Sequence, residues 1–434
     1  MLLALVLYNL GYWTVLRQAL ARRGSHIPRC EIIPYLDPLT EALQPTGPDL
    51  RWTSVKELPS PRLFVSDHPE AVRDGLPEGL LWTDEVRQPG DIEYQTFISH
   101  INGVQKPIVI GAVAENYSTT NSLQVSGQQV SFLSVFASSE NGWLAAMEES
   151  RYLGLHNAYG DLSGKLMQPV PAITLPPASR GLPSVGTLIS WRLNPNDVVG
   201  AHLRLSIHRA GGTGPVYCRY STVWAWQPEK LTARLPLMPL GPHHARGTWR
   251  TSEVQIDNAG DPLDLAKPDQ ADRYVRCIRL SQPDYPHGVK VYRSDVVYKK
   301  EQSVNPQQTN GDHGMYGARI HVLLHVRNSG KQEETVQLYL RYPDKKLNGC
   351  YVGAVTTFAR DSMGNWQPDI TRAVELNRLG KDDMTNHISR SWWLFTRCIA
   401  SYRVKAGEEL AIPLTLMHDF PAMLPLGITM RKAP

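Results

Sequence analysis

Apolar stretches of strand length, separated by turn residues at short intervals, constrain the fold of this chain more than any other feature. Examples are "PIVIGAVAENYS" (107–118), "AHLRLSIHRA" (201–210) and "GPVYCRYSTVWAWQ" (214–227). The 33 glycines and 33 prolines are spread along the whole chain, and this spacing favours many short strands over long helices. We therefore predict an all-β fold of two antiparallel β-sandwich domains, Ig-like or jelly-roll-like, with minor helical insertions.

The length of 434 residues suits two domains of ordinary size. Two proline-rich stretches punctuate the chain, and prolines at such density block both helix interiors and central strands. We predict one helix at "NGWLAAMEESRYLGL", where Asn141 is a candidate cap. The predicted division is an apolar leader or anchor (1–30), a proline-rich tether (31–51), a first β-sandwich domain (52–234), a linker (235–247) and a second β-sandwich domain (248–434).

The two predicted domains share a local sequence plan. "PIVIGAVAENYSTTNSLQV" (107–125) and "IHVLLHVRNSGKQEETVQL" (320–338) each contain an apolar strand ending near an asparagine, then a polar turn, then an alternating strand. This similarity indicates that the two halves have related folds.

The stretch "GDHGMYGARIHVLLHVRN" (311–328) contains three histidines. In a strand, Ile320, Val322, Leu324 and Val326 would share one apolar face, with His321 and His325 on the other. Histidines four residues apart lie about 13 Å apart along a strand, too far to bind one metal ion. We therefore predict a sandwich strand here, and neither a metal site nor a cofactor.

No local motif of catalysis or of nucleotide binding is present. The sequence lacks GxSxG, HExxH, a P-loop and GxGxxG, and no two cysteines form a CxxC pair. A net charge of +4, without a run of five like charges, gives no reason to expect a nucleic-acid partner. Adjacent acidic residues do not by themselves make a glycosidase pair, which must face across a cleft.

Five cysteines are present: Cys30, Cys218, Cys277, Cys350 and Cys398. The four later ones would allow two disulfides in an oxidising compartment, and buried free thiols are the alternative.

The N-terminal stretch "MLLALVLYNLGYWTVL" is apolar, and its neighbouring arginines all follow it. A signal peptide normally carries its positive charge first, so this order opposes export. A truncated or misplaced start, an atypical leader, and an interfacial helix that associates with a membrane through residues 1–16 all fit. We expect an export leader.

Tryptophans are the most suggestive binding residues. Trp224 and Trp226 would lie on one face of their strand, where an exposed pair can stack on a sugar ring or anchor a protein. Packing in the core is the alternative for both rings.

Four segments, in this order, resemble one family: "VKELPSPRLFVSDHPEAVRDGLPEGLLW", "GTGPVYCRYSTVWA", "HGMYGARIHVLLHVRNSGKQEETVQLYL" and "VKAGEELAIPLTL". The chain resembles, from about residue 52 to its end, the cyanobacterial family catalogued as domain of unknown function three-three-seven-zero. The resemblance implies an exported protein and brings no catalytic or cofactor residues. It draws attention to the "HGMYG" turn, in which His313 and Tyr316 are further candidate contacts for a ligand or partner.

These observations predict a non-catalytic binding or scaffolding protein of the cell envelope, periplasm or cell exterior. Its expected partner is another protein or a surface polysaccharide. The alternatives are a carbohydrate-active enzyme with a cleft between its domains, and an accessory subunit of a membrane-associated assembly.

Overall fold

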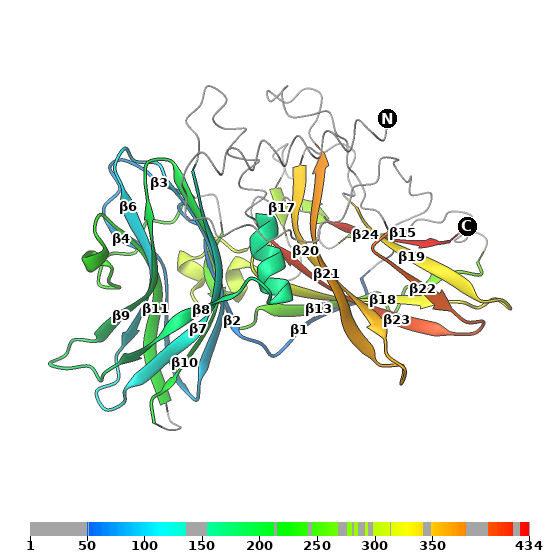
Figure 1. The fold of residues 1–434 in the computed structure, drawn as a ribbon, viewed down its shortest axis with the longest axis horizontal. Helices are drawn as coiled ribbons and strands as arrows, with labels where there is room; N and C mark the ends of the chain where they lie inside the picture. The colour runs from blue at the N-terminus through cyan, green and yellow to red at the C-terminus, as the bar shows by residue number, and fades with distance from the viewer. Residues whose placement is uncertain are drawn as a thin grey trace. The chain divides into compact units, whose positions relative to one another are not determined.

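The computed structural model describes residues 50, 52–135, 154–211, 215–241, 245–267, 276–279, 282–284, 291–293, 298–312, 314–341, 349–378, 398–419 and 426–433. Residues 34–434 form one compact unit. The predicted all-β class is confirmed: among the described residues the chain is mostly strands, with an α-helix at 154–163 and three short 3₁₀ turns (Figure 1). None of the described helical segments is long and apolar enough to cross a membrane.

The first sandwich consists of a seven-stranded and a four-stranded sheet. The large sheet has the order β12-β2-β5-β10-β7-β8, with β3 also paired to β5, and the small sheet has the order β4-β11-β6-β9. The strands are β2 (Arg62–Ser66), β3 (Ala71–Val72), β4 (Gly79–Pro89), β5 (Ile92–Asn102), β6 (Ile108–Asn116), β7 (Leu123–Val135), β8 (Gln168–Leu175), β9 (Ser184–Leu193), β10 (Asp197–Arg209), β11 (Pro215–Ala225) and β12 (Arg246–Trp249).

The second sandwich repeats this plan. Its large sheet has the order β1-β13-β18-β23-β20-β21, with β14 also paired to β18, and its small sheet has the order β15-β24-β19-β22. The strands are β1 (Ser54–Glu57), β13 (Glu253–Asp257), β14 (Leu263–Asp264), β15 (Arg276–Arg279), β18 (Arg319–Arg327), β19 (Glu334–Arg341), β20 (Gly349–Arg360), β21 (Trp366–Arg378), β22 (Ala400–Val404), β23 (Glu409–His418) and β24 (Gly427–Lys432). A separate hairpin pairs β16 (Gln282–Asp284) with β17 (Val291–Arg293).

The two sandwiches match strand for strand, including the directions of pairing in their large sheets. Most pairs are antiparallel, as predicted, but β2–β5 and β3–β5 are parallel, and so are their counterparts β13–β18 and β14–β18. A parallel pair cannot be joined by a tight hairpin, so each half needs a crossover between these strands. Both large sheets are therefore mixed.

Each sandwich takes as one edge strand the segment that directly precedes the first strand of the other sandwich, and β12 begins within the predicted linker (235–247). β1 precedes the first sandwich in the chain but pairs with β13 of the second, as the labels in Figure 1 show. β12 follows the first sandwich in the chain and pairs back with its β2. The two edge strands occupy equivalent places, so the halves are a duplicated unit with exchanged edges.

Equivalent buried asparagines fasten the turn after β5 and the turn after β18. The Asn102 side chain donates to the carbonyls of Lys106 and Leu193, at 2.9 and 3.0 Å, and accepts from the amide two residues further on. Asn328 repeats the pattern, donating at 2.7 and 2.9 Å to the carbonyls of Gln332 and Val404. When Asn328 is matched with Asn102, residues 320–338 correspond to residues 94–112. The sequence comparison had matched them with residues 107–125, which lie one strand later.

We expect Asn102→Ala and Asn328→Ala each to lower the free energy of unfolding by about 1–3 kcal/mol, because each leaves buried backbone groups without a partner. Chemical denaturation measures the change. Asn365→Ala, at an exposed hairpin turn, is the matched control with an expected change below about 0.5 kcal/mol. Equal effects at all three positions would contradict the role of the two buried asparagines.

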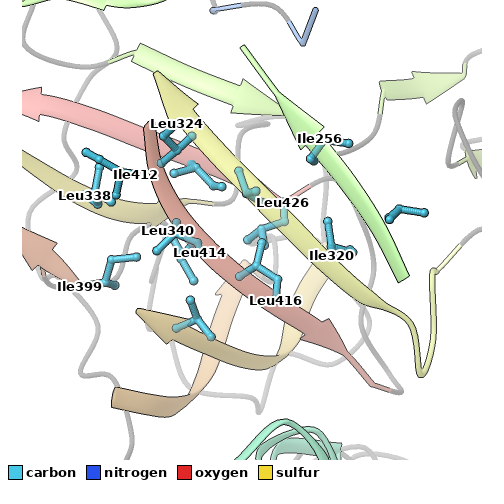
Figure 2. Packing of buried hydrophobic residues seen from close by; sticks show 14 of the residues in the cluster. Ile256, Ile320, Leu324, Leu338, Leu340, Ile399, Ile412, Leu414, Leu416 and Leu426 are labelled. Carbon is cyan, nitrogen blue, oxygen red and sulfur yellow. The ribbon is translucent and has the colours of Figure 1, made fainter. Parts of the chain in front are cut away.

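The core of the second sandwich lies on the apolar face predicted for residues 320–326. β18 alternates strictly between buried and half-buried residues, with Ile320, Val322, Leu324 and Val326 inside. Figure 2 shows Ile320 and Leu324 among leucines and isoleucines of β19 and β23. His321 and His325 lie on the other face, as predicted, and no cluster of potential metal ligands occurs among the described residues.

Several sequence predictions meet the structure only in part. The predicted helix at 141–155 lies almost wholly outside the described residues, and the observed helix begins at 154. Cys218 and Cys398 are free thiols, so the four later cysteines do not form two disulfides. Residues 1–49, which include the apolar N-terminal stretch and Cys30, lie outside the described residues.

Candidate functional site

A buried charged network joins the two sandwiches at the outer faces of their large sheets. On β10, His202 and Arg204 are two residues apart and therefore point to the same side. The strand register places them opposite Phe97 and Gln95 of β5. Asp161, in the last turn of the helix at 154–163, lies against this group with no exposed surface.

The Asp161 carboxylate accepts hydrogen bonds from several side chains. Its carboxylate accepts hydrogen bonds from the Gln95 amide, from His202 Nδ1 at 2.9 Å and from Arg204 Nε at 2.8 Å. Arg319 of β18 reaches it from the second sandwich, with Nη2 at 3.1 Å from Oδ1. Although burial opposes ionisation, the hydrogen bond from His202 and the three cationic neighbours hold the pKa of Asp161 well below its usual range.

His202 lies between two carboxylates. Its Nε2 is 2.8 Å from Oδ2 of Asp419, which directly follows β23, and its Nδ1 binds Asp161. Burial opposes the charged imidazolium, but the two carboxylates outweigh burial and raise the pKa of His202 to about 9. A protonated His202 is a cation between two carboxylates and therefore stabilises the junction.

The network continues into the second sandwich through Arg319. Its Nη1 lies 3.4 Å from Oε1 of Glu253, at the start of β13, and Glu253 Oε2 is 2.9 Å from His321 Nε2. His321 Nδ1 in turn lies 3.1 Å from the hydroxyl of Thr415. The hydrogen bond with His321 lowers the pKa of Glu253. The histidine that sequence reasoning placed on a half-exposed face therefore has a defined carboxylate partner.

The predicted "HGMYG" turn also lies at this junction. Tyr316 is half-buried and stacks on Phe97 of the first sandwich, with ring centroids 5.2 Å apart. Gly317 follows with a φ of +72°, and an added Cβ there would lie 2.9 Å from the Phe97 Cβ, so the turn requires glycine. His313, the other candidate in this turn, lies outside the described residues.

A second buried carboxylate, Asp312 beside this turn, has its pKa shifted in the opposite direction to that of Asp161. Asp312 accepts the backbone N–H of Tyr316 at 3.0 Å, and burial raises its pKa well above the usual range, with nearby Asp67 adding to the effect. Asp312 and Asp67 are both buried, with exposed fractions of 0% and 1%, whereas the two carboxylates of a glycosidase must face a cleft.

We expect Asp312→Asn to leave the free energy of unfolding at pH 7 unchanged or to raise it by up to about 1 kcal/mol, because burial disfavours the ionised carboxylate and the amide that replaces it carries no charge. Denaturant titration tests this. A loss of more than about 2 kcal/mol would show that Asp312 is needed as an ionised group.

The predicted tryptophan pair is divided between core and surface. Trp224, near the end of β11, is fully buried in the first core, and Trp226 is 39% exposed. Their rings meet edge to face, with centroids 5.4 Å apart. Trp226 alone of the two presents a ring to solvent.

The structure brings together a different aromatic group at the edge of the second sandwich. An open hollow of about 290 Å³ lies where the hairpin β20–β21 meets β22. Its lining residues are Ala359, Arg360, Trp366, Ser401, Tyr402, Arg403 and Leu410. This volume is at the lower end of the range of ligand pockets.

Rings and guanidinium groups in the hollow are held by specific contacts. Arg360 lies over the Trp366 ring at 5.0 Å, and Trp366 meets Tyr402 edge to face at 5.5 Å. The Tyr402 hydroxyl donates to the Phe358 carbonyl at 2.7 Å, and burial raises its pKa to about 12. The Arg403 side chain is 81% exposed. The hollow therefore combines two aromatic rings with two arginines, which also pair with carboxylates: Arg360 with Glu408 at 3.2 Å and Arg403 with Glu333 at 3.8 Å.

A buried tryptophan occupies the place of Tyr402 in the first sandwich. The carbonyls of Val404 and Leu193 accept hydrogen bonds from the equivalent residues Asn328 and Asn102. Tyr402 and Trp191 each lie two residues before these carbonyls, so they occupy equivalent positions. Trp191 is only 6% exposed, and its Nε1 lies 3.4 Å from the Ser131 hydroxyl. The aromatic residue at this position is therefore half-buried in the second sandwich and buried in the first.

Comparisons with known proteins assign no family. No family model matches the chain, and no curated protein matches it. Solved structures similar to it include the N-terminal CBM22-1-CBM22-2 tandem domain of Paenibacillus barcinonensis Xyn10C, at 6% identity over 90% of this chain and 100% of that one, with a TM-score of 0.14. The ANXUR2 extracellular domain of Arabidopsis thaliana has 8% identity over 86% of this chain and 96% of that one, also with a TM-score of 0.14. Such low scores carry no argument about the ligand.

Proposed function

We propose that this protein is a non-catalytic binding protein that takes an acidic polysaccharide in the hollow at the edge of the second sandwich. The observation that supports this most is the combination of Trp366, Tyr402 and two arginines in one open depression. Aromatic side chains present a flat apolar surface on which the C–H face of a sugar can lie. Guanidinium groups bind carboxylates in a planar, two-point geometry, which suits a uronic acid.

The size and position of the hollow favour a polysaccharide over a folded protein partner. A volume of about 290 Å³ accepts a single ring-sized group, and the hollow is open to solvent. A specific protein interface would bury about 800 Å² on each partner around such a pocket.

We expect Trp366→Ala and Arg360→Gln each to weaken binding of uronic-acid oligosaccharides about tenfold or more, as calorimetry would measure, because each removes one recognition element of the hollow. Trp226→Ala is the matched control: it removes an exposed tryptophan of the first sandwich and should leave affinity unchanged. Melting curves of all three variants verify that folding is intact.

Two outcomes would overturn this proposal. One is unchanged affinity for acidic oligosaccharides in Trp366→Ala, and the other is no binding of them by the unaltered protein. Capture of a protein from an envelope extract, dependent on Trp366 and insensitive to added oligosaccharide, would instead support a protein partner at the hollow. Release of reducing ends from an acidic polysaccharide would support the alternative of a carbohydrate-active enzyme.

We also propose that the protein works in the cell envelope, periplasm or cell exterior, on the basis of the family resemblance and the apolar stretch in residues 1–16. The expectation is that fractionation of native cells recovers the protein with the envelope or the medium. Recovery with the cytoplasmic fraction would contradict it.

A further inference from the structure

The exchanged edge strands cross at one defined point. β1 is connected to β2 by residues 58–61, and β12 is connected to β13 by residues 250–252. The hydroxyls of Ser60 and Thr251 lie 2.5 Å apart, and Ser60 Oγ also accepts the backbone N–H groups of Ser252 and Glu253, both at 3.1 Å. The two connections therefore pass each other in direct contact as each half sends a strand to the other.

The connection after β1 directs that strand away from its own half. It contains Pro59 and Pro61, and the residue before a proline favours an extended conformation. An extended connection does not fold β1 back onto β2 as a hairpin, and the edge of β2 is already occupied by β12. β1 is thus built as an arm that must be received by another sandwich.

The arm is a small, separable element. β1 occupies the end of its sheet and pairs only with β13, in the register from Ser54 opposite Asp257 to Glu57 opposite Val254. Val55 packs partly against the second core, and the hydroxyl of Thr53 bonds Asp257 at 3.3 Å. All these contacts are with the second sandwich, so a β13 from any copy of the chain supplies them equally.

We propose that β1 is an exchangeable arm and that a second copy of this chain fits its receiving edge, which gives a reciprocal strand-exchanged dimer. In such a dimer β1 of each copy lies on β13 of the other, with the same hydrogen bonds as in the monomer. The β1–β13 contacts form in both states, so the balance depends on concentration: the single chain is favoured when dilute, and exchange grows when the protein refolds at high concentration.

The test mixes two differently tagged full-length chains, one carrying Val55→Cys and the other Ile256→Cys. These residues are directly opposite in the register of β1 and β13. After unfolding together and refolding at high concentration under oxidising conditions, we expect a disulfide-linked species that carries both tags, several-fold above the background from the native cysteines. Lys56→Cys replaces Val55→Cys in the matched control, because its side chain points to the opposite face of the strand.

A chain carrying both Val55→Cys and Ile256→Cys makes the result decisive. It should form the disulfide within one chain when refolded dilute, which establishes that the thiols are correctly placed. If it does so while the mixed chains give no more doubly tagged product than the Lys56→Cys control, the proposal is overturned. The outcome does not depend on what the hollow binds.

Discussion

Replacing Asp161 by alanine is expected to lower the free energy of unfolding by about 3–5 kcal/mol, because it removes the carboxylate on which the cations of the junction converge. His202 is fully buried and would lose one of its two carboxylate partners. Arg204 and Arg319 would lose the same anchor. An uncompensated buried charge costs far more than a broken pair at the surface.

Chemical denaturation at pH 7 measures this effect. Asp369→Ala is the matched control, since Asp369 is an exposed aspartate on β21, and its expected change is below about 0.5 kcal/mol. A double-mutant cycle with Arg319→Ala adds a sharper readout, because Asp161 and Arg319 belong to different sandwiches. We expect a coupling of about 1 kcal/mol or more. Additive effects would mean that this ion pair does not link the sandwiches energetically.

The second large effect is a fall in stability on the alkaline side. In the folded protein the pKa of His202 is about 9, above an unfolded value of about 6.5. A raised pKa means that the folded state binds the proton more tightly, so this contribution is complete below pH 6.5. It is lost as the pH rises through 9. The shift corresponds to about 3 kcal/mol of the free energy of unfolding.

Two other buried histidines act in the opposite direction. Burial lowers the pKa of His418 to about 4 and that of His156 to about 3, so their contributions are present above pH 6.5 and lost as the pH falls. Together the three histidines predict maximal stability near pH 6.5. Unfolding curves measured from pH 5 to pH 9.5 provide the measurement.

The His202→Gln variant tests whether His202 causes the fall in stability at alkaline pH. It should be less stable at pH 6.5, because the charged contacts with Asp161 and Asp419 are gone, and its stability should fall less between pH 6.5 and 9 than that of the unaltered protein, since Asp312 with its raised pKa still contributes. The loss of stability as the pH falls below 6.5 should remain, because His418 and His156 are unchanged. A fall in stability above pH 6.5 that is as large in this variant as in the unaltered protein would assign the effect to another group.

Local sequence patterns were sufficient for the strands but not for their partners. β18 was predicted correctly because alternation of side chains is a property of the strand itself, visible in residues 319–327. β1, with the sequence SVKE, carries no apolar pattern that specifies an edge. Its pairing with β13 brings together segments about 200 residues apart, which only the packing of both sandwiches selects.

The sequence predicted only those site residues that lie within a recognisable local pattern. Tyr316 and His321 were singled out with their stretch, and both lie at the junction. Asp161, His202 and Asp419 were not singled out, because nothing near each in the chain distinguishes it from other charged residues. Trp366 was one of 11 tryptophans, and it becomes a candidate only beside Tyr402 and Arg360.

By itself the sequence determined the all-β class, the alternation of the core strands and the likeness of the two halves, because these follow from local spacing and turn residues. The tertiary structure alone decided the exchange of β1 and β12, the charge network around Asp161 and the opening of the hollow at Trp366. Each of these depends on contacts between distant segments. Their energies arise from burial and charge in the folded state, and no short stretch of sequence carries that information.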